Sequence, residues 1–170
     1  MIKIERLLPF RVDTMINSCN LLFDKQGLEW LNRSAGFWRI DESLSQLHNP
    51  TTNVIFKIEK LNPVKVGDKL QICKGYVATI ESINLKRLSS MLECEAMAAG
   101  VQCFGHKKYK HYCPELFFPK TVLKDQQPGF PFMNNAVASF NTLWIKKYGI
   151  TEMYLDPWIW QYEFKIVNRT

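Results

Sequence analysis

The sequence predicts a single α+β domain over residues 1–170, built on a mixed or antiparallel sheet in the form of a small β-barrel. The C-terminal run WIWQYEFK at residues 158–165 carries aromatic side chains at every second position. That period is typical of a strand with one buried face. Residues 135–148 place apolar side chains at helical spacing, and Gly149 follows as a stop. With 170 residues and 46% hydrophobic content, the chain is large enough for one packed core.

The first half of the chain predicts short elements. Residues 1–23 mix apolar and charged positions, which indicates a strand-like start followed by a short helix or turn. Residues 28–33 favour a helical turn. The β-rich run VIFKIE at 54–59 predicts a strand, which Asn62-Pro63 breaks because proline cannot continue it.

The second half predicts longer elements. A Gly-Asp turn at residues 67–68 leads into a strand that ends near Ile72, and residues 76–88 predict a long strand. Ser90 is expected to cap a short helix over residues 91–99. The following segment, 103–135, is rich in Lys, Pro, Tyr and Phe and lacks clear periodicity. It is expected to be a long, partly ordered loop insertion, and long loops in compact domains are usually functional or mobile.

The charge balance favours an anionic partner. There are 22 basic and 16 acidic residues, so the formal net charge is +6 and the isoelectric point is near 9.1. Such a balance is typical of proteins that bind nucleic acid. It is equally compatible with a basic protein that has no polyanionic ligand.

Cysteine usage and hydropathy predict a cytoplasmic protein. The five cysteines are odd in number and lack the spacing of a disulfide framework, which favours reduced thiols. The first residues, MIKIER, lack the apolar core of a signal peptide. No apolar run approaches the roughly 20 residues that cross a bilayer, so no membrane partner is expected.

Two basic and aromatic clusters are the candidate nucleic-acid contacts. Lysine can contact phosphate and tyrosine can stack on a base, and arginine can do both. For the first cluster, residues 107–110, the alternative is a solvated loop. For the second cluster, Arg33, Trp38 and Arg39, the alternative is a Trp38 that is buried in the core. Lys74 adds a basic position after the strand near residue 72. The predicted nucleic-acid-binding residues are Arg33, Trp38, Arg39, Lys74, Lys107, Lys108, Tyr109 and Lys110.

Cys103, His106, His111 and Cys113 gather thiols and imidazoles within eleven residues. These ligand types suit Zn²⁺, and the Cys-x2-His spacing matches one half of a zinc knuckle. The remaining spacings are unusual and no second pair follows, so free side chains are the alternative. No metal and no cofactor is assigned.

Three blocks resemble the ASCH family of the PUA-like superfamily, in particular its bacteriophage and prophage members. PVKVGDKL at residues 63–70 is similar to the family's P-x-x-x-G-D-x-L turn and strand. The run from Ile83 to Val101 is similar to its strand, short helix and A-x-A-E-G ending. The third block is the C-terminal helix with its Trp-rich strand. Together they cover about the last two thirds of the chain, without the 103–135 insertion.

The resemblance implies a PUA-like β-barrel in a protein that contacts RNA or handles modified nucleosides. Some relatives hydrolyse acylated cytidine with a Lys and a Thr from a G-R-K-T-x-T-R-R segment and a Glu from the short helix. In this chain Ala99 stands at the Glu position, and Ser34 and Ala35 stand at the Lys and Thr positions. These departures from the resembled pattern favour a scaffold kept for binding over an enzyme, with the catalytic set gone.

Three functions follow as hypotheses. The first is binding of RNA, single-stranded DNA or a modified nucleotide, with RNA the foremost partner. The second is a divergent hydrolase of acylated nucleosides or RNA, in which Ser34, Glu93 or Glu95 replaces the missing groups. The third is a protein-interaction factor that acts on a host protein, with the 103–135 segment as its contact surface.

Overall fold

The computed structural model describes residues 21–33, 38–42, 45–62, 64–73, 76–113, 116 and 132–169. The expectations for residues 1–20 and for Ser34, Ala35 and Lys74 lie outside this part of the chain. The elements are β1 (Leu21–Asp24), α1 (Glu29–Arg33), β2 (Arg39–Asp41), β3 (Gln46–Asn49), β4 (Val54–Lys57), α2 (Ile58–Leu61), β5 (Lys69–Cys73), β6 (Tyr76–Arg87), a 3-10 turn η1 (Leu88–Ser90), α3 (Glu93–Ala98), β7 (Tyr109–Lys110), β8 (Phe132–Met133), α5 (Ala136–Tyr148), α6 (Ile150–Tyr154) and β9 (Trp158–Arg169).

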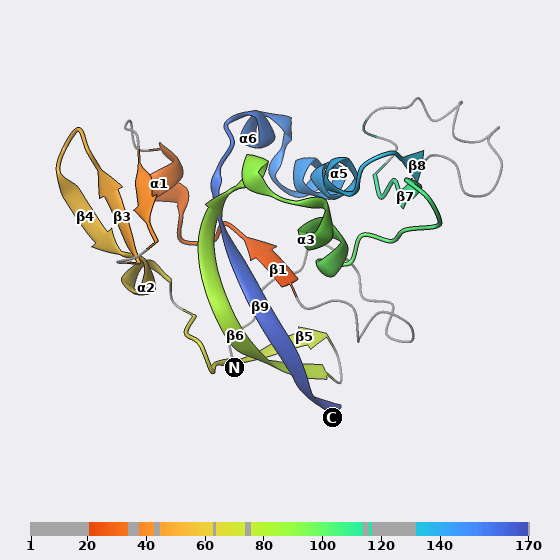
Figure 1. The fold of residues 1–170 in the computed structure, drawn as a ribbon, viewed down its shortest axis with the longest axis horizontal. Helices are drawn as coiled ribbons and strands as arrows, with labels where there is room; N and C mark the ends of the chain where they lie inside the picture. The colour runs from red at the N-terminus through yellow and green to blue at the C-terminus, as the bar shows by residue number, and fades with distance from the viewer. Residues whose placement is uncertain are drawn as a thin grey trace.

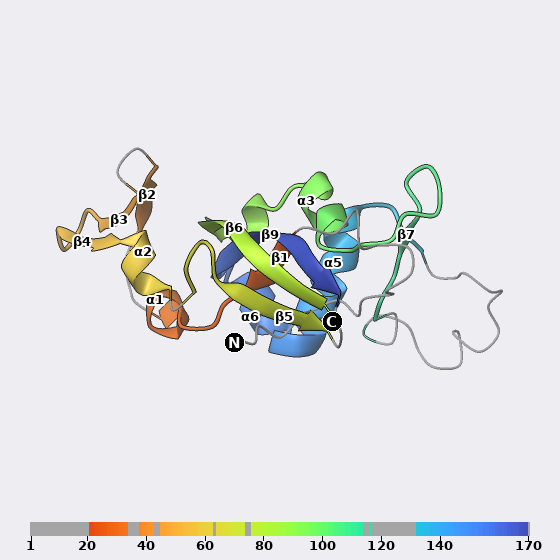
Figure 2. The same cartoon turned by 90° about the horizontal axis from the view of Figure 1, so that it is seen from below.

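The main sheet is antiparallel and has the strand order β1-β9-β6-β5. Strands β6 and β9 are each 12 residues long and form its curved centre (Figure 1). Register shifts between Val77 and Ala78 and between Ile80 and Ser82 mark bulges, which increase the local twist and bend a strand. The sheet is a curled half-barrel (Figure 2), which confirms the α+β class and is compatible with a small β-barrel.

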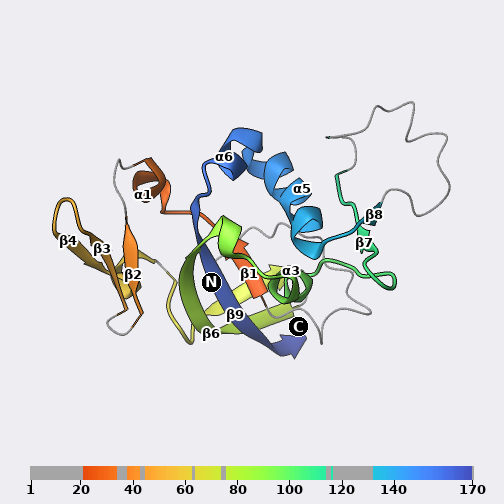
Figure 3. The ribbon, with the colours of Figure 1, turned by 45° about the horizontal axis from the view of Figure 1, so that its top comes forward.

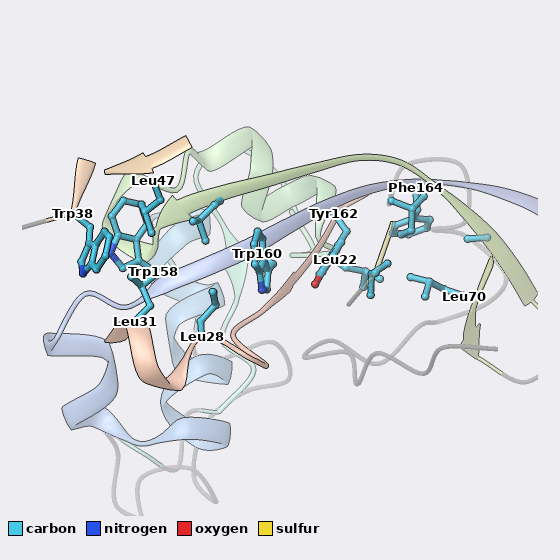
Figure 4. Close-up of a cluster of buried hydrophobic side chains, with 14 residues drawn as sticks. Leu22, Leu28, Leu31, Trp38, Leu47, Leu70, Trp158, Trp160, Tyr162 and Phe164 are labelled. Atoms are coloured by element: carbon cyan, nitrogen blue, oxygen red, sulfur yellow. The ribbon is translucent and has the colours of Figure 1, made fainter. Parts of the chain in front are cut away.

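The alternation predicted for the C-terminal strand is confirmed. Trp158, Trp160, Tyr162 and Phe164 of β9 are all buried in one core cluster (Figure 4). Ile159 belongs instead to a second cluster, with residues of α3 and α5. Because successive side chains of a strand point to opposite faces, β9 joins two cores across one sheet.

Helix α5 forms where its periodicity predicts. The Asn135 side-chain oxygen accepts a hydrogen bond from the Ala138 N–H at 3.1 Å, which caps the first turn. Gly149 ends the helix with φ +94°, a conformation that favours glycine. Phe140 and Trp144 are fully or almost fully buried and supply the helix's contribution to the second core.

Two local predictions are corrected. The strand predicted over 54–59 ends at Lys57. Lys57 pairs with Gln46, the first residue of the partner strand β3, so β3 offers no residue with which β4 could pair further. The chain then enters the short helix α2. Ser90 does not cap α3, which begins at Glu93 with Leu92 as the N-cap residue.

Two small sheets lie at opposite ends of the half-barrel (Figures 1 and 3). Strands β2, β3 and β4 form one, beside α1, and strands β7 and β8 form the other. The predicted 103–135 insertion therefore contains paired strands rather than only loop. Among the described residues, no helix has both the length and the apolar content to cross a membrane.

Candidate functional site

The two predicted nucleic-acid clusters do not form one surface. Arg33 lies at the end of α1 and Arg39 at the start of β2, next to one small sheet. Lys110 is in β7 at the opposite end of the molecule, and Lys107 and Lys108 directly precede that strand (Figure 3). Within the described residues, a ligand would contact one end or the other.

At the α1 end, the aromatic side chain predicted to stack on a base is covered by protein. Trp38 is 8% exposed and belongs to the core. Its ring lies edge-on to Trp30, with centroids 6.0 Å apart, and is 5.7 Å from the ring of Phe56. Arg33 and Arg39 are exposed beside this aromatic cluster. The alternative interpretation of Trp38 as a core residue fits this geometry.

At the β7 end, a tight turn presents the lysines. Cys103 and Tyr109 form an antiparallel bridge, and the Phe104 N–H donates to the Lys108 carbonyl at 2.8 Å. Gly105 has φ +125° and Lys107 has φ +50°, so the turn passes through conformations that ordinary strands do not use. Lys107, Lys108 and Lys110 are exposed, whereas Tyr109 is buried in the second core.

Two phenylalanines, rather than Tyr109, are the exposed aromatic residues on this surface. Phe104 is 57% exposed and Phe132 is 38% exposed, and their ring centroids are 5.7 Å apart. Phe132 pairs with Lys110 in the β7–β8 register, which places a lysine beside the aromatic pair. We call Phe104, Lys107, Lys108, Lys110 and Phe132 the Phe–lysine surface.

The sequence analysis missed both phenylalanines. Phe104 stands three residues before the lysine run, and Phe132 is separated from it by more than twenty residues. Because the contact depends on pairing between β7 and β8, a local pattern of basic and aromatic residues could not reveal it. The density of phenylalanine in the 103–135 segment was the available signal.

The four candidate zinc ligands lie partly at the surface and partly in the core. Cys103 and His106 are exposed, whereas His111 and Cys113 are buried. The Cys103 Sγ lies 3.0 Å from the Gly105 carbonyl, within its own turn. No group of three or more His, Cys, Asp and Glu side chains close enough for a metal occurs among the described residues. The arrangement fits the alternative of separate side chains.

A groove of about 1340 Å³ lies beside β6, away from the Phe–lysine surface. Residues Ile83 to Lys86 of β6 line one side, and Ile58 to Lys60 with Asn62 and Val64 to Val66 line the other. Neither predicted cluster contributes a residue to it. The groove is thus a second feature of the surface, which the sequence analysis did not predict.

A lysine–carboxylate pair lies in this groove. The Lys86 Nζ contacts both carboxylate oxygens of Glu95, at 2.8 and 2.7 Å, and the two side chains are 17% and 15% exposed. The Leu92 N–H donates to the same carboxylate at 2.7 Å. Since both oxygens already accept hydrogen bonds, Glu95 joins α3 to β6 and neutralises Lys86.

The residues named for the hydrolase alternative differ in their surroundings, and among those that the structure describes Glu95 is the one that lies in the groove. Glu93 is exposed, and Ala99, which the resemblance aligned with a catalytic Glu, is buried and cannot transfer a proton. Ser34 lies outside the described residues. Glu95 was named for the hydrolase alternative, but its contact with Lys86 was not anticipated from the sequence.

Comparison of the chain with protein-family models, curated proteins and solved structures finds no match. The geometry of the surface and of the groove is therefore the basis for any functional assignment.

Proposed function

We propose that this protein binds single-stranded nucleic acid, with RNA the foremost ligand, at the Phe–lysine surface. The observation that carries the proposal is the exposed Phe104–Phe132 pair, 5.7 Å between centroids, beside three exposed lysines. Proteins that hold single strands without reading their sequence combine these two elements, with bases stacked on aromatic rings and phosphates on cations.

The local charge supports a polyanionic ligand. Residues 103–113 contain no Asp or Glu, while they hold Lys107, Lys108 and Lys110. The cationic field of the turn is therefore not cancelled by carboxylates of its own segment. Arg33 and Arg39 remain candidate contacts of lower rank, because Trp38 is covered and the 41% exposed Trp30 is the accessible ring beside them, without a second exposed ring in contact with it among the described residues.

The scaffold is part of the proposal. The curled antiparallel sheet is compatible with the PUA-like barrel that the resemblance to phage ASCH proteins implies. We propose that the ligand binds at the separate β7–β8 sheet, and we assign no reaction to it. Lys74, outside the described residues, stays a predicted contact.

The test is fluorescence anisotropy with a labelled oligouridine, titrated with wild-type protein over a series of salt concentrations. Binding should weaken steeply as salt rises, because lysine contacts release counterions from the strand. Phe104→Ala and the double change Lys107→Ala with Lys108→Ala should each weaken it, whereas Lys57→Ala, an exposed lysine of β4, should not. Binding that does not depend on salt concentration, or that is unaffected both by Phe104→Ala and by the double lysine change, would contradict the proposal.

The hydrolase alternative has a separate readout. Incubation with acylated cytidine should give no turnover by the wild-type protein, because the Glu95 carboxylate is already fully engaged. Turnover that Glu95→Gln abolishes would establish the alternative.

A further inference from the structure

Within the described residues, one edge of β6 has no partner strand where it borders the groove. Between Ser82 and Arg87, β6 pairs with β9 in continuous register, from Ser82↔Glu163 to Arg87↔Trp158. On the other side, its pairing with β5 extends only from Tyr76 to Thr79. Two further bonds, at Ile80, connect β6 to Gly67 and Asp68. Among the described residues, no strand pairs with the outer edge of β6 beyond Ile80.

The register shows which backbone groups face the groove. The Leu88 N–H donates to the Pro157 carbonyl at 3.0 Å, so position 88 faces β9. Backbone groups alternate along a strand, and therefore Asn84 and Lys86 also face β9, whereas Ile83, Leu85 and Arg87 face outward. The Arg87 carbonyl accepts from the Ser90 Oγ at 2.7 Å, so the available edge ends at the Arg87 N–H.

A turn at residues 65–68 keeps this edge open. The Asp68 N–H donates to the Lys65 carbonyl at 3.0 Å, and the Lys65 N–H donates to the Asp68 carboxylate at 2.8 Å. Gly67 has φ +90°, which favours glycine at this point. The turn directs the chain before β5 away from β6. This part of the chain therefore forms the opposite side of the groove and does not extend β5 along β6.

The outward-facing backbone N–H and C=O groups of β6 lie in a largely buried part of the groove. Leu85 is 6% exposed, and Ile58 and Val64 line the groove opposite β6. Buried backbone N–H and C=O groups are nearly always paired in native proteins, by backbone, side chain or water. An added strand would pair them and cover the exposed Val66, which is 63% accessible at the rim.

The charged residues that line the groove indicate which kind of peptide can bind there. The exposed charges in its lining are Lys60 and Lys65 against Glu42 and Glu59, and Lys86 is neutralised by Glu95. This balance does not attract a polyanion, in contrast to the Phe–lysine surface. It complements an extended peptide of near-zero net charge, with an aliphatic side chain for the Ile58 and Val64 side of the groove.

We propose that the groove binds such a peptide segment of a partner protein, which pairs with Ile83, Leu85 and Arg87 as an additional strand of the half-barrel. No residue of the Phe–lysine surface lines the groove, so this inference is independent of the proposed RNA binding.

Selection of a displayed library of short random peptides on the full-length protein supplies the probe. Recovery of peptides with an uncharged centre and an aliphatic residue, which bind as synthetic peptides, is the expected result. Failure to recover any binding peptide would overturn the proposal.

Amide hydrogen exchange then tests the geometry. A selected peptide should slow exchange at Ile83, Leu85 and Arg87 and leave Asn84 and Lys86 unchanged, because those two already pair with β9. Protection of all five positions alike, or of none, would overturn the proposal.

Two variants test the location. Val66→Arg changes an exposed rim residue, should leave the fold intact, and should weaken peptide binding about tenfold, whereas the matched change Val167→Arg on β9 should not. Ile83→Pro removes one outward N–H and should also weaken binding. If Val66→Arg leaves peptide binding intact, the proposal fails, even if Ile83→Pro proves unstable.

Two other occupants have their own signatures. Concentration-dependent dimerisation that Val66→Arg abolishes would assign the edge to a second copy of this chain and overturn the proposal. Loss of oligouridine binding in Val66→Arg would assign the groove to nucleic acid and overturn it equally.

Discussion

The two ends of the molecule hold similar residue types and present different surfaces. At the α1 end, Trp38 is buried against Phe56 and the 41% exposed Trp30, and the exposed Arg33 and Arg39 are near it in the chain. At the β7 end, Tyr109 is buried as well, but Phe104 and Phe132 meet in the open beside the lysines. Basic residues are thus accessible at both ends, and an exposed aromatic pair with lysines around it occurs at the second.

The ends differ in their acidic neighbours too. Glu29 opens α1 itself, and Asp41 ends β2, so carboxylates are interspersed with the arginines. Residues 103–113 contain none. Burial raises the pKa of the Tyr109 phenol and the charge of Glu93 in α3 raises it further, so the β7 end also has an acidic neighbour from another element. Because carboxylates weaken the attraction of a polyanion to cations, the contrast favours the β7 end, whose turn itself contains no Asp or Glu. The following four predictions test it, from the largest expected effect to the smallest.

Trp38→Ala should lower the free energy of unfolding by about 3 kcal/mol or more, because it leaves a cavity in the core. Oligouridine affinity of the folded fraction should not change. Chemical denaturation measures the first effect and anisotropy the second, and Trp30→Ala, at a half-exposed ring, should cost clearly less. A Trp38 variant of normal stability that fails to bind RNA would reverse the contrast.

Phe104→Ala should show the opposite pattern. The side chain is 57% exposed, so unfolding free energy should change by less than about 0.5 kcal/mol. Affinity for oligouridine should fall by about 1–3 kcal/mol, the usual cost of losing one stacked base. Leu92→Ala, an equally exposed apolar residue at the start of α3, is the control and should bind normally.

Lys107→Ala with Lys108→Ala should act mainly on the salt dependence. Each phosphate contact on a single strand contributes about 0.7 to the slope of log affinity against log salt, so loss of two should reduce that slope by about 1.4. Anisotropy titrations at several salt concentrations measure it. An unchanged slope would mean that these lysines do not contact phosphate.

Arg33→Ala with Arg39→Ala should have the smallest effect, a change in oligouridine affinity of less than about twofold, equivalent to roughly 0.4 kcal/mol. The same titrations measure it. If this pair weakens binding more than the two lysines of the turn, the α1 end is the interface, and the ranking of the two surfaces is wrong.

The long segments whose side-chain period buries one face were predictable from the sequence. The aromatic alternation of β9 and the helical spacing of α5 each report a long element that buries one face, and each is found at its predicted place. The charge pattern also located the exposed lysines near β7. Short elements were less predictable, since α2 and the start of α3 depend on where a partner strand ends and on a single carboxylate, Glu95.

The candidate sites depend on long-range contacts. Phe104 meets Phe132 because β7 pairs with β8, and the groove exists because the chain before β5 turns away from β6 at Gly67. Lys86 and Glu95 are near in sequence, yet their contact requires α3 to fold back onto β6. No local pattern contains this information.

By itself, the sequence determined the α+β class, the central strands with their buried aromatic face, the main helix and the excess of positive charge. These follow from side-chain periodicity and composition, which act over a few residues. Tertiary structure alone decided which rings are covered, where two phenylalanines stay exposed, and which edge of β6 has no partner strand among the residues that the structure describes. Those outcomes depend on contacts between distant segments, because burial is set by what packs against a residue rather than by the residue itself.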